Sequence, residues 1–135
     1  MADIPTDERL LGEIYRRYLD DFSNYSDENK TRSAKIWVPV DIDMLAKKFR
    51  CDPDLIFGRL YYHMDGRYGS QTEQGERANV FAMRIGRDAH CVNFPLMASV
   101  LADLRTDKKR FVISTRIAAL SLILSAISIG LAIWL

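Results

Sequence analysis

The segment from Ile117 to Leu135 carries no charged side chain, and it constrains the fold of this chain more than any other feature. As a helix it would extend about 28 Å, close to the ~30 Å hydrocarbon core of a bilayer. We therefore expect a single membrane-spanning helix over 117–135 that anchors the protein by its tail. The alternative is the central helix of a soluble bundle, since a helix that is apolar all round is buried in protein or in lipid. The preceding residues are too few to form a core and also surround this helix.

Basic side chains gather on the N-terminal side of this segment. They are Arg105, Lys108, Lys109, Arg110 and Arg116, and no lysine or arginine follows the segment. Because cytoplasmic flanks of membrane helices are enriched in such residues, we expect a single-pass protein with a cytoplasmic N-terminal head. The first ten residues lack the basic start and apolar stretch of a secretory signal. Two cysteines, Cys51 and Cys91, are too few for a disulfide framework, which fits a reducing compartment.

The rest of the chain is long enough for one compact domain and too short for two. We expect four parts, which are an N-terminal tail (1–6), a cytoplasmic domain (7–105), a basic juxtamembrane linker (106–116) and the membrane helix (117–135). The net charge is +1, yet residues 35–110 carry 13 basic and 10 acidic side chains. This modest excess favours contact with anionic lipid headgroups at least as much as with nucleic acid.

The hydrophobic pattern of the first third of the head predicts a helix, a loop and a short strand. Apolar side chains recur at helical spacing over residues 7–22, with Thr6 placed to cap the helix. Residues 23–35 are rich in serine, asparagine and charge, which predicts a loop. Residues 36–40 form a short β-rich run, and Pro39 restricts this strand to the edge of a sheet.

Residues 40–64 carry the strongest motif in the head. They predict a short helix over 42–49, a tight turn at 50–52 and a second helix that begins at Pro53. The pattern resembles a helix-turn-helix, because small Ala46 stands where that family lets the two helices approach. The glycine that the family prefers in the turn is replaced by Arg50.

The residues after this motif read as a β-hairpin. Two alternating runs, 78–85 and 90–94, are separated by a turn at 86–89. The order helix, strand, helix, helix, strand, strand over residues 7–94 is similar to the winged-helix superfamily. The resemblance implies an α+β fold, a winged helix-turn-helix with a small antiparallel sheet. A C-terminal helix from Pro95 and one transmembrane helix would follow it.

The resemblance implies DNA binding, with the second helix of the motif in the major groove. Candidate contacts are Lys47, Lys48, Arg50, Arg59, Arg84 and Arg87. Arg59 is the only permanent cation at the outward positions of that helix, and Asp52, Asp54 and Asp65 would face phosphates. The basic residues also fit scattered solvated charges. Only residues 105–110 separate the last head helix from lipid, so DNA would have to fit within ~20 Å of an anionic surface.

Protein binding is the interpretation that we favour, with the head as an interaction or regulatory module. Tyr61 and Tyr62 are adjacent on a helix, so they point about 100° apart and cannot both face inward. Tyrosine is enriched at interfaces, and Gly58 in mid-helix would suit a backbone that passes close by, or is simply tolerated. The candidate partner surface consists of Gly58, Arg59, Tyr61, Tyr62 and His63.

The sequence shows no constellation typical of an enzyme, a cofactor site or a metal site. His90 and Cys91 are neighbours on a predicted strand, where successive side chains point to opposite faces and cannot easily share one ion. The glycines of residues 65–77 follow no phosphate-binding pattern, and we expect a flexible loop there. We therefore expect a protein that is not an enzyme and that holds no cofactor or metal.

Small residues form a stripe along the predicted membrane helix. They are Ala118, Ser121, Ser125, Ser128 and Ala132. Because helices in lipid associate through close backbone approach and interhelical hydrogen bonds, the stripe predicts a homo-oligomer. The alternative is the general richness of membrane helices in small residues. A third function, a small membrane-disrupting effector, depends on this stripe alone.

Overall fold

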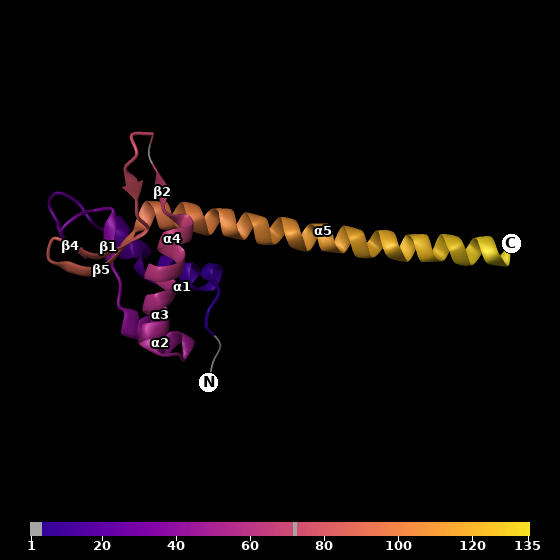
Figure 1. Ribbon diagram of the computed structural model, residues 1–135, viewed down its shortest axis with the longest axis horizontal. Coiled ribbons are helices and arrows are strands. Elements are labelled where there is room, and N and C mark those ends of the chain that lie inside the picture. Colours follow the sequence, from indigo (N-terminus) through magenta and orange to yellow (C-terminus); the bar gives the residue numbers. More distant parts are fainter. Residues whose placement is uncertain (1–3, 72) are drawn as a thin grey trace. The chain divides into compact units, whose positions relative to one another are not determined.

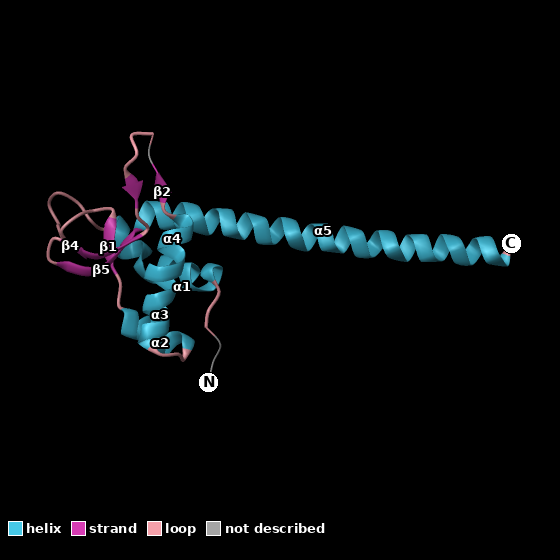
Figure 2. Ribbon diagram, in the orientation of Figure 1, coloured by secondary structure: helices cyan, strands magenta, loops and turns pink. Residues whose placement is uncertain are grey.

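The computed structural model describes residues 4–71 and 73–135. The chain divides into two compact units, a head unit that ends at Leu101 and a second unit, Ala102–Leu135. Helices alternate with short strands through the head unit, and a long helix follows (Figure 1). The helix, strand and loop assignments can be followed in Figure 2. The head is therefore a mixed α+β unit, as expected.

Helix α1 (Asp7–Ser23) follows the predicted boundaries closely. The Thr6 hydroxyl accepts a hydrogen bond from the Arg9 N–H at 3.3 Å and caps the helix. One face of α1 is buried through Leu10, Leu11, Ile14 and Tyr18. The Tyr18 hydroxyl accepts a hydrogen bond from the Asp41 N–H at 2.8 Å, which ties α1 to the start of the next helix.

Helices α2 (Ile42–Phe49) and α3 (Pro53–Gly58) form the predicted helix-turn-helix pair. Asp41 and Asp52 cap them, each through a side-chain oxygen that accepts a backbone N–H. Arg50 ends α2 in the left-handed region, with φ 58° and ψ 42°, and its N–H donates to the carbonyls of Ala46 and Lys47. An arginine thus occupies the backbone conformation for which the family prefers glycine.

The second helix of the pair continues beyond α3 without a break. Residues Arg59–Met64 form a π-helix, η1, and Asp65–Tyr68 form a short α-helix, α4. Ile56, Leu60 and Met64 are fully buried. The Asp65 carboxylate accepts hydrogen bonds from the N–H groups of Val80 and Phe81, so the end of this helix is fixed to the sheet.

Three antiparallel strands form the main sheet, in the order β1-β5-β4. They are β1 (Trp37–Pro39), β4 (Phe81–Ile85) and β5 (Asp88–Asn93). Val92 of β5 lies opposite Val38 on one side and Phe81 on the other. Pro39 lies on the edge strand β1, where a missing N–H removes no ladder hydrogen bond.

The expectation of a flexible loop over 65–77 is wrong. Its first residues form α4, and strands β2 (Ser70–Gln71) and β3 (Arg77–Ala78) pair antiparallel. The Arg77 guanidinium donates to the Asp65 carbonyl at 2.7 Å. Long-range hydrogen bonds of this kind order a polar segment that has no hydrophobic period of its own.

The core of the head lies between α1, the helix pair, the sheet and the start of helix α5 (Phe94–Trp134). Phe94 stacks on Phe22 and Tyr15 of α1, with ring centroids 4.8 and 5.6 Å apart. Met97 and Leu101 are also buried, so the first two turns of α5 complete the core. The whole arrangement is compatible with a winged-helix-like fold.

Helix α5 continues through the second unit to Trp134. The residues expected to act as a linker, 106–116, are therefore helical. Among the described residues, α5 is the one helix long and apolar enough to cross a membrane, and its most apolar stretch is not buried against the rest of the chain. This part of the sequence-based expectation is confirmed at the level of length and composition.

Candidate functional site

A buried carboxylate of α1 contacts the second helix of the helix-turn-helix pair. Asp7, in the first turn of α1, is only 6% exposed. Its Oδ1 lies 2.5 Å from Nη2 of Arg59, and its Oδ2 accepts a 2.5 Å hydrogen bond from the Tyr68 hydroxyl. The His63 Nε2 lies 3.2 Å from the same Oδ2. We call Asp7, Arg59, His63 and Tyr68 the Asp7 cluster.

The electrostatics of the Asp7 cluster favour an ionised carboxylate. Burial opposes the charge, but the hydrogen bond from Tyr68 and the charge of Arg59 outweigh it, so the pKa of Asp7 is lowered. Burial and the adjacent carboxylate raise the pKa of Tyr68 to about 12. The cluster is thus a charge-assisted clamp between α1 and the second helix.

Side chains outside the Asp7 cluster form the exposed side of the second helix. Tyr62 is 79% exposed and Leu55, two turns earlier, is 42% exposed. A Cβ placed on Gly58, between them, would meet only the Tyr62 ring, at 3.6 Å. We call Leu55, Gly58 and Tyr62 the Tyr62 face. It is an apolar and aromatic surface of α3 and η1, whose one arginine, Arg59, is paired with Asp7.

Tyr61, the other tyrosine of the pair, has a structural position. Its hydroxyl donates to the Ala82 carbonyl at 3.2 Å and lies 3.3 Å from Nδ1 of His90. Its ring packs against Phe57, with centroids 4.5 Å apart, and burial raises its pKa to about 12. The 100° divergence expected from the sequence therefore separates an anchoring tyrosine from an exposed one.

An acidic groove of about 340 Å³ lies at the N-terminal ends of α2 and α3. Phe57 and His90 contribute to its lining, together with the carboxyl-bearing residues Asp41, Asp43 and Asp54. None of the described residues that line it is a lysine or an arginine. This end of the second helix would repel phosphates.

The residues predicted to contact DNA are found on separate elements. Lys47, Lys48 and Arg50 are exposed at the end of α2, and Arg84 and Arg87 are exposed on the β4-β5 hairpin. Arg59, the member on the second helix, is held by Asp7. The predicted partner residues divide in the same way, because Arg59 and His63 belong to the Asp7 cluster while Gly58 and Tyr62 face outward.

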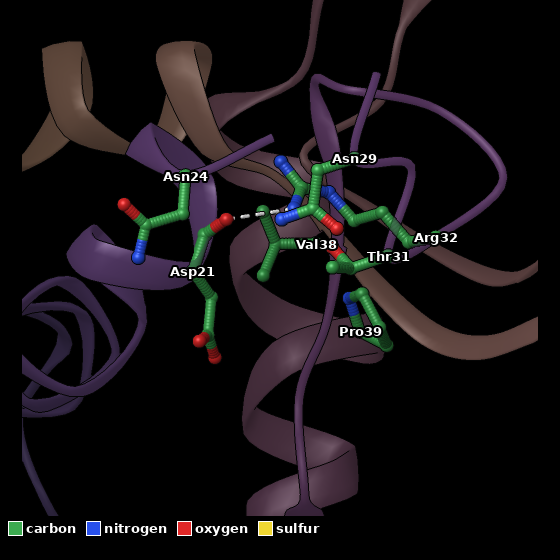
Figure 3. A pocket seen from close by; sticks show the side chains of 7 residues that line it. All are labelled: Asp21, Asn24, Asn29, Thr31, Arg32, Val38 and Pro39. Atoms are coloured by element: carbon green, nitrogen blue, oxygen red, sulfur yellow. Dashed lines mark hydrogen bonds between the residues drawn. The ribbon is translucent and has the colours of Figure 1, made fainter. Parts of the chain in front are cut away.

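A buried arginine that sequence reasoning missed lies beside a polar pocket of the head. Arg32 is 8% exposed and donates to the carbonyls of Ala34 and Lys35. It also donates to the Asp21 carbonyl at 2.8 Å, and this bond is drawn in Figure 3. Its guanidinium stacks on Tyr25 at 4.7 Å. The pocket of about 360 Å³ is lined by Asp21, Asn24, Asn29, Thr31, Arg32, Val38 and Pro39. Nothing in the polar stretch 23–35 distinguished this arginine from its charged neighbours.

The expected stripe of α5 consists of exposed residues at helical spacing. The hydroxyls of Ser121, Ser125 and Ser128 each donate to the carbonyl four residues earlier, at 2.9–3.0 Å. Their polar groups are therefore satisfied inside the helix, which suits a lipid environment. The small side chains of the stripe would let the backbone of a neighbouring helix approach closely.

Metal-binding and reactive groups are sparse. Within residues 4–71 and 73–135, no group of three histidine, cysteine, aspartate or glutamate side chains could hold a metal ion. Both cysteines are free thiols, and burial raises the pKa of each. Comparisons with protein-family models, with curated proteins and with solved structures find no match to this chain. The function must therefore be argued from the geometry.

Proposed function

We propose that this protein is a winged-helix-like protein-interaction or regulatory module attached to a membrane by α5, with its head in the cytoplasm. The observation that carries this proposal is the ion pair between Arg59 and the buried Asp7. Arg59 is the only lysine or arginine of α3 and η1, so the pair occupies the one cation of this part of the helix, and Arg67 follows on α4. What remains outward is the Tyr62 face.

The order of strands supports the winged-helix assignment. The first strand of the head, β1, pairs with the last, β5, and β5 pairs with β4 in a hairpin. The helix-turn-helix pair lies between β1 and β4 in the sequence. A helix pair that follows one strand and precedes a hairpin is the order that the resemblance implies.

Protein binding fits the exposed surface better than DNA binding does. A DNA-reading helix needs cations near phosphates and polar side chains at base edges. Here α3 and η1 present Leu55 and Tyr62 beside Asp52 and Asp54. Tyrosine supplies a large contact area and a polar tip, which is why it is frequent among the residues that dominate protein interfaces.

Duplex binding by the full chain in detergent, measured as a function of salt, discriminates between the two functions. We expect no binding beyond that of a scrambled basic peptide at low salt. Salt-dependent binding that is lost when Lys47 and Lys48 are changed to glutamate would contradict the protein-binding function and establish the DNA-binding alternative.

Photo-crosslinking tests the Tyr62 face directly in cells. A photoreactive residue at position 62 should give a discrete adduct with a partner protein, and one at exposed Met83 on β4 should not. The adduct at position 62 should weaken when Leu55 is changed to Ser. Equal adducts at positions 62 and 83 would show that the Tyr62 face is not a specific surface.

We also propose that the small-residue stripe mediates self-association of α5 in the membrane. Changing Ser121 and Ser125 to Leu should reduce oligomers in detergent, because bulky side chains keep the two backbones apart. The matched control changes Ala119 and Ala126, on the opposite side of the helix, to Leu. An oligomer unaffected by the serine changes, or weakened equally by both pairs, would contradict the stripe.

A further inference from the structure

The charges at the start of the second unit are segregated on α5. At about 100° per residue, Lys109 and Arg116 lie about 20° apart around the helix axis, and Arg105 lies between 0° and 40° from both. Asp103 and Asp107 fall about 160–200° from Arg105. We define the basic face as Arg105, Lys108, Lys109 and Arg116. The opposite face is acidic.

Two apolar side chains lie among these cations. Val112 is 40% exposed and Ile113 is 47% exposed, and both line a shallow groove together with the four residues of the basic face. The groove runs along one side of a single helix and ends where the uncharged segment begins at Ile117. A strip that combines four cations with two aliphatic side chains is amphipathic.

We propose that the basic face is a binding site for anionic phospholipid. The inference rests on the membrane attachment proposed above. A phospholipid presents a phosphate to Lys109 and Arg116 while its acyl chain runs along Val112 and Ile113 toward the hydrocarbon. Long basic side chains reach headgroups from a helix at this depth while their aliphatic stems stay in apolar surroundings.

Continuity with the uncharged segment favours lipid over nucleic acid as the occupant. Nucleic acid offers no apolar chain to cover Val112 and Ile113, whereas a lipid supplies both a phosphate and an aliphatic tail. The acidic side of the helix, with Asp103 and Asp107, would face away from such a lipid. Only one side of α5 is therefore complementary to an anionic headgroup.

The chain contains its own control for general electrostatic attraction. Arg110 lies about 140° from Arg105 and three positions after Asp107, on the acidic side of α5. Changing Arg110 to Gln removes one charge, as changing Lys109 or Arg116 does, and it does so at nearly the same depth as Lys109. A site predicts that these positions differ, and a diffuse field predicts that they do not.

The test uses the full chain reconstituted in phosphatidylcholine vesicles that contain some phosphatidylglycerol. Spin-labelled forms of the two lipids report their relative association with the protein. We expect wild type to prefer phosphatidylglycerol, and Lys109→Gln or Arg116→Gln to lower that preference about fivefold each, the effect of ~1 kcal/mol per cation near the surface. Arg110→Gln should leave the preference within about twofold of wild type, which is less than half of that energy.

Three results would overturn the site. They are no preference in the wild type, an equal loss in Arg110→Gln, and displacement of the labelled lipid by inorganic phosphate at constant ionic strength. The last result would assign the face to free phosphate. A chain that reconstitutes but shows no preference contradicts the lipid site alone, whereas a chain that alkaline buffer extracts from the vesicles contradicts the membrane attachment as well.

Discussion

Arg50 is the residue whose replacement tests the helix-turn-helix geometry most directly. It is exposed, it ends α2 in the left-handed region, and its backbone N–H caps the helix. In this conformation the Cβ of an L-residue crowds the following carbonyl, whereas glycine adopts it without strain. We predict that Arg50→Gly is more stable than Arg50→Ala.

The size of the difference follows from three contributions. Left-handed backbone costs an L-residue about 1–2 kcal/mol, which glycine recovers. Glycine also gives the unfolded chain more freedom, which costs about 0.4–1 kcal/mol. Both variants lose the same favourable charge near the C-terminus of α2, about 0.3–1 kcal/mol, so it cancels between them. The expected advantage of glycine over alanine is therefore about 1 kcal/mol.

The measurement is thermal unfolding of the full chain in mild detergent, followed by the fluorescence of Trp37. Trp134 is the only other tryptophan, and Trp134→Phe removes it from the signal. For a head of this size, 1 kcal/mol corresponds to about 4–8 °C in Tm. If the Gly variant melts at or below the Ala variant, Arg50 does not hold a left-handed turn, and the predicted helix-turn-helix geometry is refuted.

Three further changes probe contacts that hold the head together, each measured by the same unfolding assay. Asp7→Asn should lower stability by about 2 kcal/mol, less than the ~3–5 kcal/mol of a fully buried pair because Arg59 is partly exposed; no loss would contradict a clamp. The pKa of Asp7 is lowered in the folded head, so the stability that its carboxylate contributes is fully present above about pH 4. This stability disappears as the pH falls through the pKa of Asp7 in the folded head. Wild type should therefore lose stability more steeply than Asp7→Asn below pH 4. Gly86→Ala should cost about 1–3 kcal/mol, since φ is +58° and a Cβ would lie 2.7 Å from the Ser33 hydroxyl oxygen, and an unchanged Tm would refute this turn. Arg32→Lys should cost about 2 kcal/mol, because an ammonium cannot reach the carbonyls that the guanidinium joins, and equal stability would show that those contacts are dispensable.

Local signals in the sequence were sufficient for most of the elements. Thr6 and Pro53 mark the starts of two helices, and the structure begins those helices within a residue of each. Pro39 marked an edge strand, and β1 is at the edge of its sheet. Such features depend on a few neighbouring residues, so their physical causes are visible in one short stretch of sequence.

Contacts between distant residues could not be predicted in this way. Asp7 in the first turn of α1 suits the helix dipole, but nothing near it in the sequence points to its partner His63, 56 positions later. The π-helix over Arg59–Met64 changes the spacing of side chains, which a constant period of 3.6 residues does not anticipate. Arg32 likewise depends on the carbonyls at the end of α1, which no local pattern reveals.

A charged side chain that is paired within the fold is not available to a binding partner. Arg59 is paired with Asp7, so α3 and η1 present Leu55 and Tyr62 to solvent instead of a free cation. Asp52 and Asp54, which precede Leu55 in the sequence, are exposed. Because apolar contact supplies affinity and complementary charge supplies specificity, the proposed protein-binding function calls for a partner patch with apolar side chains and basic residues at one end.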